Sequence, residues 1–263
     1  MQPVAFDLTP LAQRLEAQRK SSAGPAASPV PHAVLPEHLT ASGSWASTLA
    51  LEQIHVLATH VLARYGERPF ASVAITSALP GEGKTTITLA LAQRLAQARK
   101  RVLVVDFDLH RCALTREVLL ESARGVMEAI ADGSVHTPLP WYPTECPGLC
   151  ITPRGAVPNQ RSLPLPDKAR IQGVLARARE QGFELVVVDC PPLVPVADAH
   201  VIGEAVDGAV MVVRANATPR PVVEQAVEEF GRDRFFAAVL NRASPGRIPY
   251  FREVYGYYRG GPS

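Results

Sequence analysis

The residues with the clearest chemical potential form a glycine-rich turn that leads into Lys84 and Thr85. The segment reads Ala78-Leu79-Pro80-Gly81-Glu82-Gly83-Lys84-Thr85-Thr86 and separates an apolar run from a helical pattern. Glycines let backbone N–H groups approach phosphate oxygens, and the start of the following helix adds partial positive charge. Lys84 can bridge two phosphates, and the Thr85 hydroxyl can ligate Mg²⁺. We therefore predict that Pro80 to Thr86 bind a nucleotide, although Ala78 replaces the first glycine of the strict pattern.

Three aspartates follow two other apolar runs. Asp106 and Asp108 close RVLVVDFD, and Asp189 closes LVVVD. The carboxyl ends of parallel strands meet at one edge of a sheet, where phosphates bind, so these side chains are expected near Lys84. A lone aspartate at a strand end is usually a cap or turn residue, but three of them beside a phosphate loop favour catalysis. Each carboxylate could hold Mg²⁺ or accept a proton, and the pattern does not assign these roles.

Short apolar runs alternate with helical patterns from residue 49 onward. Runs that are apolar on both faces, separated by helices, predict a mostly parallel sheet with helices on both faces. The expected fold class is therefore α/β, of the P-loop NTPase type. We expect strands at 71–76, 101–106, 149–152, 185–189, 208–213 and 236–240, and helices at 49–65, 85–98, 168–181 and 221–230.

Composition and patterning set the boundaries of this domain. The chain has 263 residues, of which 47% are apolar, and a net charge of +2, which indicates a soluble protein and argues against nucleic-acid binding. We expect a flexible N-terminal tail and linker at 1–48 with a short helix at 11–19, a nucleotide-binding domain at 49–248, and a tyrosine-rich tail at 249–263. No membrane span or secretory signal is evident. The four cysteines lack metal-ligand spacing and indicate reduced thiols in a cytoplasmic protein.

Together these residues resemble the bacterial tyrosine kinases of polysaccharide synthesis and export, the BY-kinases. The family motifs read like PGEGKT, hydrophobic-D-x-D-L-R-R and hydrophobic-D-x-P-P, and they match residues 80–85, 102–111 and 185–192. Residues 123–133 and 196–218 also resemble family segments, and the family ends in a tyrosine-rich tail as this chain does. The resemblance covers residues 49–258, which is most of the chain.

The resemblance implies an ATP- and Mg²⁺-dependent protein-tyrosine autokinase that regulates polysaccharide synthesis or export. Asp108 matches the family residue expected to act as the base, and Asn241 resembles a position that contacts adenine, although from the residues alone a turn role is equally plausible. The implied catalytic residues are Lys84, Asp106, Asp108 and Asp189; the metal ligands are Thr85, Asp106 and Asp189; the phosphoacceptors are Tyr250, Tyr255, Tyr257 and Tyr258.

The resemblance also implies partners. A family member of this kind forms a homo-oligomer and works with a membrane chain-length regulator that activates it. It is dephosphorylated by a tyrosine phosphatase. A cytoplasmic chain would then be recruited by its activator to the inner face of the membrane.

Three departures from the family keep other functions open. His110 stands where the second motif usually has its first arginine, and the family's assembly motif E-x-x-R-x-x-R is reduced here to Glu52, His55 and Ala58. Cys190 replaces a common threonine. The alternatives are a nucleotide-binding regulator with weak or no kinase activity, and a partition or positioning type of switch ATPase. Such ATPases usually carry an extra lysine where this chain has Leu79, and this difference favours the kinase.

Overall fold

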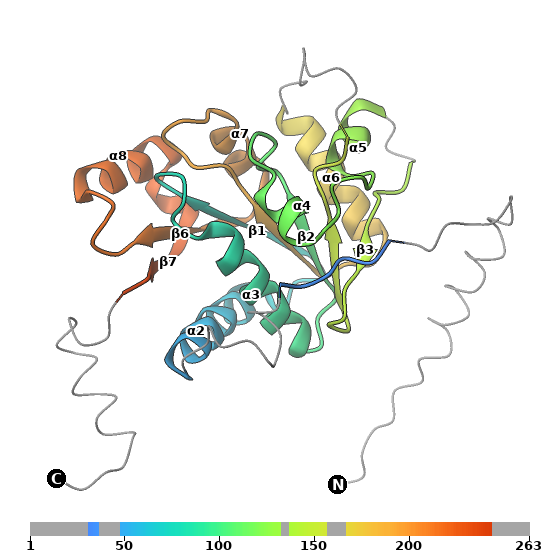
Figure 1. Cartoon of the computed structure of the whole chain (residues 1–263), viewed down its shortest axis with the longest axis horizontal. Coiled ribbons are helices and arrows are strands. Elements are labelled where there is room, and N and C mark those ends of the chain that lie inside the picture. The colour runs from blue at the N-terminus through green and yellow to red at the C-terminus, as the bar shows by residue number, and fades with distance from the viewer. Residues whose placement is uncertain (1–30, 37–47, 133–136, 157–166, 244–263) are drawn as a thin grey trace, which may run out of the picture. The chain divides into compact units, whose positions relative to one another are not determined.

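The computed structural model describes residues 31–36, 48–132, 137–156 and 167–243. These residues contain a seven-stranded sheet in the order β3-β4-β2-β5-β1-β6-β7 (Figure 1). The edge strand β3 is antiparallel to β4, and the other neighbouring strands are parallel. The strands are β1 (Ala71–Ser77), β2 (Val102–Asp106), β3 (Tyr142–Pro143), β4 (Leu149–Thr152), β5 (Leu185–Asp189), β6 (Gly208–Arg214) and β7 (Phe235–Asn241).

The three central strands are buried along their whole length. Every residue of β1, β2 and β5 is buried, whereas the edge strand β7 is only partly buried. A parallel strand covered on both faces buries all its side chains, so its sequence is a continuous apolar run. This is why VLVVD and LVVVD do not alternate between apolar and polar residues. The pairing register places Asp106 directly beside Asp189 at the carboxyl edge of the sheet.

Helices cover both faces of the sheet (Figure 1). Successive strand residues point to opposite faces, so Val73 faces one helical layer and Ala74 faces the other. The first layer consists of α2 (Thr48–Tyr65), α3 (Lys84–Gln97) and α4 (Ala113–Glu117). The second layer consists of α5 (Val126–Asp132), α6 (Lys168–Glu180), α7 (Asp198–Ala205) and α8 (Arg220–Phe230).

The structure confirms the expected α/β fold class. Each strand and helix expected between residues 49 and 241 is present, and no end differs from its expected position by more than one residue. The sequence patterns missed α4, α5, α7, β3 and a short 3₁₀ turn at Arg232–Arg234. These elements have two to eight residues, which is too short for a period of 3.6 or 2 to be recognised.

Residues 32–36 correct part of the expected flexible linker, because they pack against the domain. Ala33 and Leu35 are buried in the core between the sheet and the first helical layer. The N–H groups of Ala33 and Val34 donate to the carbonyl oxygens of Pro143 and Val118, at 3.0 and 3.2 Å. The Leu35 N–H donates to a carboxylate oxygen of Glu145 at 3.2 Å. This segment therefore covers the edge of the sheet at β3.

Two expected features lie outside the described residues: the helix at 11–19 and the tyrosine-rich tail at 249–263. Among the helices that are described, none combines the length and the apolar character needed to cross a membrane.

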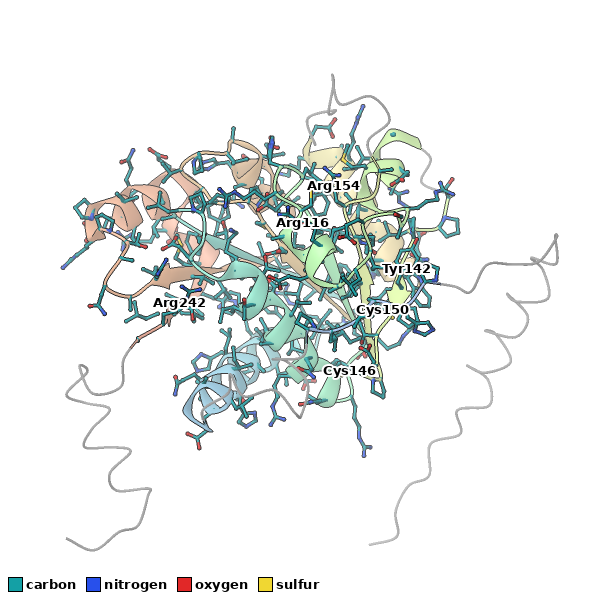
Figure 2. The ribbon with its side chains drawn as sticks, in the orientation of Figure 1. Arg116, Tyr142, Cys146, Cys150, Arg154 and Arg242 are labelled. Carbon is teal, nitrogen blue, oxygen red and sulfur yellow. The ribbon has the colours of Figure 1, made fainter. Side chains whose placement is uncertain are left out.

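All four cysteines carry free thiols. Cys146 and Cys150 lie on the β3–β4 hairpin (Figure 2), and Cys112 and Cys190 are buried. Burial raises the pKa of the Cys150 thiol to about 11 and raises the pKa of Cys190 well above its usual value. Because the thiolate is the reactive form, these raised pKa values disfavour reaction of Cys150 and Cys190 at neutral pH.

Candidate nucleotide-binding site

The phosphate loop, residues 78–83, connects the end of β1 to the start of α3. Gly81 and Gly83 have φ angles of 79° and 95°, in the left-handed region that favours glycine. A Cβ atom on Gly83 would lie 2.2 Å from Nδ2 of Asn241, whereas a Cβ atom on Gly81 would have nothing within 4 Å. Gly83 is therefore required for the close approach of the last residue of β7 as well as for its own backbone conformation.

Lys84 and Thr85 begin α3, next to the carboxyl ends of β1 and β5. The Gly83 carbonyl accepts from the Ile87 N–H at 3.1 Å, so the helix starts directly after the loop. The first N–H groups of a helix lack intrahelical acceptors and attract anions. Lys84 is buried, with 7% of its surface exposed, so its ammonium is held inside the site.

Asp189 is bonded to the first turn of α3. The Thr85 hydroxyl donates to its Oδ2 at 2.8 Å, and the Thr88 hydroxyl donates to its Oδ1 at 3.2 Å. Asp189 and Asp106 are fully buried, and they are register partners on adjacent strands. The structure therefore brings together the phosphate loop and two of the three aspartates expected at this edge.

A short helix positions Asp106. The backbone N–H and the hydroxyl of Thr115, in α4, donate to Asp106 Oδ2 at 3.0 and 2.6 Å. The Thr115 hydroxyl also accepts from the Arg154 N–H at 2.8 Å, which joins α4 to the segment that follows β4. Thr115 is a positioning residue that sequence patterns missed, since nothing in its local sequence distinguishes it from a surface threonine.

Asp108 lies two residues beyond the end of β2. It is 3% exposed, and its Oδ1 accepts from the Arg111 N–H at 3.1 Å. Its own N–H donates to Asp106 Oδ1 at 3.1 Å, so the two aspartates share one turn of the chain. The third expected aspartate is thus beside the other two.

Burial sets the acidity of the carboxylate pair. It raises the pKa of Asp189 to about 8, assisted by the charge of Asp106 and opposed by Lys84 and the Thr85 hydroxyl. Burial likewise raises the pKa of Asp106 to about 6, opposed by the hydrogen bonds from Thr115. Two buried carboxylates side by side cannot both ionise easily without a cation between them.

The donor set fits Mg²⁺ bound together with a nucleotide. Carboxylate and hydroxyl oxygens from Asp106, Asp189 and Thr85 are the hard ligands that Mg²⁺ prefers, and the raised pKa values indicate a need for positive charge. No cluster of three or more His, Cys, Asp or Glu side chains suited to a metal occurs in the described part of the chain. A magnesium ion here would take its remaining ligands from phosphate oxygens and water, as is usual for this ion.

Two sequence-assigned positions have unexpected partners. The Asn241 side chain donates from Nδ2 to the Glu82 carbonyl at 2.8 Å and accepts from the Arg242 N–H at 2.9 Å. Asn241 therefore contacts the phosphate loop directly, and its contact with adenine stays a prediction. His110 Nε2 lies 3.3 Å from Asp198 Oδ2, which joins the loop after β2 to the start of α7.

The four expected phosphoacceptor tyrosines lie outside the described residues. The other two tyrosines have structural contacts. Tyr65 is buried, and its hydroxyl donates to the Asp207 carbonyl at 3.2 Å. The Tyr142 hydroxyl donates to the Arg124 carbonyl at 3.1 Å.

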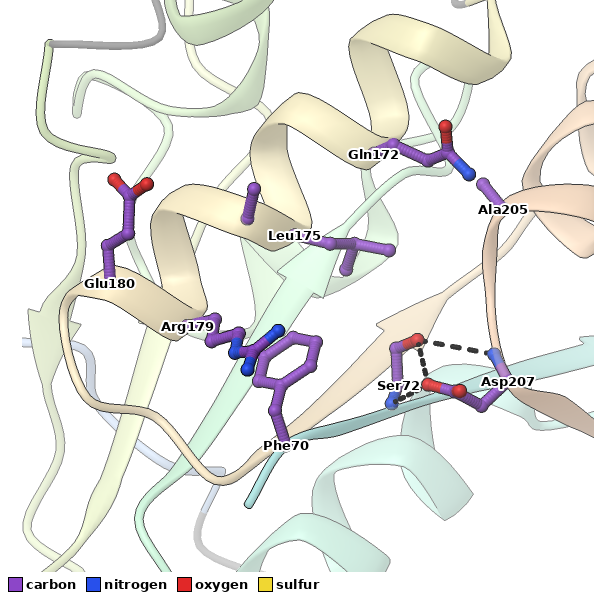
Figure 3. A pocket seen from close by; sticks show the side chains of 9 residues that line it. Phe70, Ser72, Gln172, Leu175, Arg179, Glu180, Ala205 and Asp207 are labelled. Carbon is purple, nitrogen blue, oxygen red and sulfur yellow. Dashed lines mark hydrogen bonds between the residues drawn. The ribbon is translucent and has the colours of Figure 1, made fainter. Parts of the chain in front are cut away.

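A separate surface hollow lies near the amino end of β1, away from the phosphate loop (Figure 3). Phe70 and Leu175 line it, together with Arg179 and Asp207. The Asp207 carboxylate accepts from the backbone N–H and the hydroxyl of Ser72 at 2.8 and 2.9 Å, so it is already hydrogen-bonded within the fold. This hollow contains none of the residues expected to do chemistry.

A family model describes the class to which the fold and site belong. Residues 73–245 match the CobQ/CobB/MinD/ParA nucleotide binding domain, and the chain belongs to this family. Within that class it is a domain of the bacterial tyrosine-kinase type, as its similarity to solved kinase domains shows. The structure of the VpsO kinase domain is 30% identical, with a TM-score of 0.60, over 75% of this chain and 98% of that one.

Two further relatives agree with this assignment. The kinase domain of Escherichia coli tyrosine kinase ETK is 25% identical, with a TM-score of 0.61, over 82% of this chain and 92% of that one. The tyrosine-protein kinase YwqD of Bacillus subtilis (strain 168) is 29% identical over 80% of this chain and 87% of its own length.

Proposed function

We propose that this chain is an ATP- and Mg²⁺-dependent protein-tyrosine autokinase that regulates polysaccharide synthesis or export. The observation that carries the proposal is the hydrogen bond from Thr85, in the first turn of α3 directly after the phosphate loop, to Asp189 at 2.8 Å. Asp106 lies beside Asp189 in register, so a metal bound to this pair would also meet the phosphates held by the loop. The relatives named as tyrosine kinases support the same reaction.

Each side chain has a defined task in this proposal. Backbone N–H groups of residues 81–86 and the Lys84 ammonium bind the phosphates, while Thr85, Asp106 and Asp189 hold Mg²⁺. When bound, ATP supplies the phosphoryl group and Mg²⁺ neutralises the charge that develops during transfer. Both carboxylates are fully buried, so they are shielded from bulk solvent.

The phosphoacceptor needs a base. A tyrosine hydroxyl has a pKa of about 10 in water and stays protonated at neutral pH, so its proton must be accepted as the oxygen bonds to phosphorus. Asp108 is proposed as this base. It lies at the same carboxyl edge of the sheet and takes no part in the hydrogen bond between Thr85 and Asp189. The acceptors proposed are the four tail residues Tyr250, Tyr255, Tyr257 and Tyr258.

The proposal extends to the setting of the protein. It places the chain in the cytoplasm, recruited to the inner face of the membrane by a chain-length regulator that activates it. A tyrosine phosphatase reverses the modification, and homo-oligomerisation brings one tail to the site of a neighbouring copy.

Phosphopeptide mapping of the protein from its native cells tests the kinase assignment. We expect phosphate on the tail tyrosines, and its loss in the variant Lys84→Ala, because the loop would no longer bind the phosphates productively. Lys168→Ala is a matched control, since Lys168 is an exposed lysine of α6 whose ammonium pairs with Glu204. Phosphate that persists in Lys84→Ala would identify another kinase. Nucleotide binding without phosphotyrosine would identify a regulator or a switch ATPase.

A further inference from the structure

The side chain of Glu82 is buried inside the phosphate loop, where it is 2% exposed. Its Oε2 accepts from the Leu79 N–H at 2.7 Å, across the turn of the loop itself. Its Oε1 accepts from the Arg214 N–H at 3.0 Å and from the Thr218 hydroxyl. The carboxylate therefore joins the loop to the end of β6 and to the segment that precedes α8.

The backbone of the same residue makes a further link. The Glu82 carbonyl accepts from Nδ2 of Asn241, at the end of β7, at 2.8 Å. Glu82 thus connects the turn after β1 to the ends of two neighbouring strands. These partners lie 132 to 159 residues away in the sequence, so the loop geometry depends on the finished sheet.

An acidic residue in a loop that binds phosphates needs an explanation, since its charge repels the ligand. Hydrogen bonds from three donors to one carboxylate are strong because the acceptor is ionised. A glycine-containing turn without such bonds would sample many conformations, and binding would have to order it. The contacts of Glu82 hold the turn in one shape before any ligand arrives.

We propose that Glu82 is a positioning residue that pre-forms the phosphate loop for a nucleoside di- or triphosphate, with the Thr218 hydroxyl as its main side-chain partner. The inference rests on the proposed nucleotide site and assigns a role to a side chain that the motif leaves unspecified. It does not depend on which acceptor receives the phosphoryl group.

The variant Glu82→Gln tests this role. A glutamine amide offers one acceptor oxygen and one NH₂ group, so it cannot accept from both the Leu79 and the Arg214 N–H groups, which face different oxygens of the carboxylate. The loss of one charge-assisted hydrogen bond is expected to raise the Kd for ATP and for ADP by about tenfold each. Both ligands are affected because both present a β-phosphate to the loop.

Variants of Thr218, the side-chain partner of Glu82, provide an independent test. Thr218→Val removes the hydroxyl and is expected to weaken ADP binding, whereas Thr218→Ser keeps the hydroxyl and should restore it. Glu82→Ala removes the acceptor of the Thr218 hydroxyl altogether, so adding Thr218→Val to Glu82→Ala should weaken ADP binding no further.

A matched control separates positioning from general destabilisation. Glu184 also accepts from a backbone N–H, that of Arg101 at 2.9 Å, but it lies at the opposite edge of the sheet. Glu184→Gln should lower stability without changing the Kd for ADP. Amide hydrogen exchange in residues 79–86 of the nucleotide-free protein should become faster in Glu82→Gln and not in Glu184→Gln.

The results distinguish this inference from the proposed kinase function. Calorimetric titration with ADP and with Mg²⁺·ATP measures binding directly and needs no phosphoryl transfer. An unchanged Kd in Glu82→Gln overturns the positioning role even if the tail is phosphorylated. A tenfold weaker Kd in Glu82→Gln, together with a wild type that forms no phosphotyrosine, supports the positioning role and overturns the kinase function.

Discussion

The two left-handed glycines of the phosphate loop have different surroundings, and a pair of alanine variants measures that difference. A Cβ atom on Gly81 would meet nothing within 4 Å, whereas one on Gly83 would lie 2.2 Å from Nδ2 of Asn241. Both alanines carry the strain of a left-handed residue, about 1–2 kcal/mol. Only Gly83→Ala must also move the Asn241 side chain and break its hydrogen bond to the Glu82 carbonyl, worth about 1 kcal/mol.

The expected losses in the free energy of unfolding follow from these contributions. We expect about 1–2 kcal/mol for Gly81→Ala and about 2–3 kcal/mol for Gly83→Ala. Asn241→Ala should lose about 1 kcal/mol alone and almost nothing further when added to Gly83→Ala, because the hydrogen bond is already broken. Added to Gly81→Ala, it should have its full effect. Replacing glycine by alanine lowers the conformational entropy of the unfolded chain equally in both variants, so this contribution cancels when their unfolding free energies are compared.

Urea unfolding of the nucleotide-free protein provides the assay, with unchanged m-values as the check that the variants unfold alike. The wild type, three single variants and two double variants complete both cycles. Equal losses for the two glycine variants would refute the reasoning, and so would full additivity between Gly83→Ala and Asn241→Ala. Either result would mean that Asn241 does not contact the loop in the free protein.

Two further predictions concern the acidic pair and the N-terminal segment. Asp189 has a pKa of about 8 in the fold and about 4 when unfolded, so between these pH values the folded state binds more protons, and the free energy of unfolding should fall as pH rises. Asp189→Asn should flatten this dependence and stabilise the protein at pH 8, as measured by urea unfolding from pH 6 to 9 without divalent cations; an unchanged slope would contradict the burial of this charge. Leu35→Ala should lose about 2–5 kcal/mol of stability, because Leu35 is 4% exposed in the core. Val34→Ala, at a residue 43% exposed, should change stability by no more than about 0.5 kcal/mol, and equal effects would mean that residues 32–36 do not pack as described.

Much of the fold was predictable because its signals are local. The central strands are apolar at nearly every position, and the helices between them are long enough to show their period, so the α/β class followed directly. The phosphate loop was equally accessible, since its glycines, Lys84 and Thr85 are contiguous and each has its own chemical reason. Residues 32–36 were misassigned because their Pro- and Ala-rich composition is typical of a linker, while their burial depends on a sheet edge far along the chain.

The residues able to bind phosphate, and the strand ends that carry carboxylates, could be identified without a structure. How these groups are held could not, because it depends on contacts between distant segments. Thr115 bonds to Asp106 through a helix too short to predict, and Glu82 bonds to Arg214 across 132 residues. The reason is physical: hydrogen-bond partners and burial depend on which strands are neighbours, and neighbouring strands here are distant in the sequence. The raised pKa values of Asp106 and Asp189 have the same origin, since each results from burial in the assembled sheet.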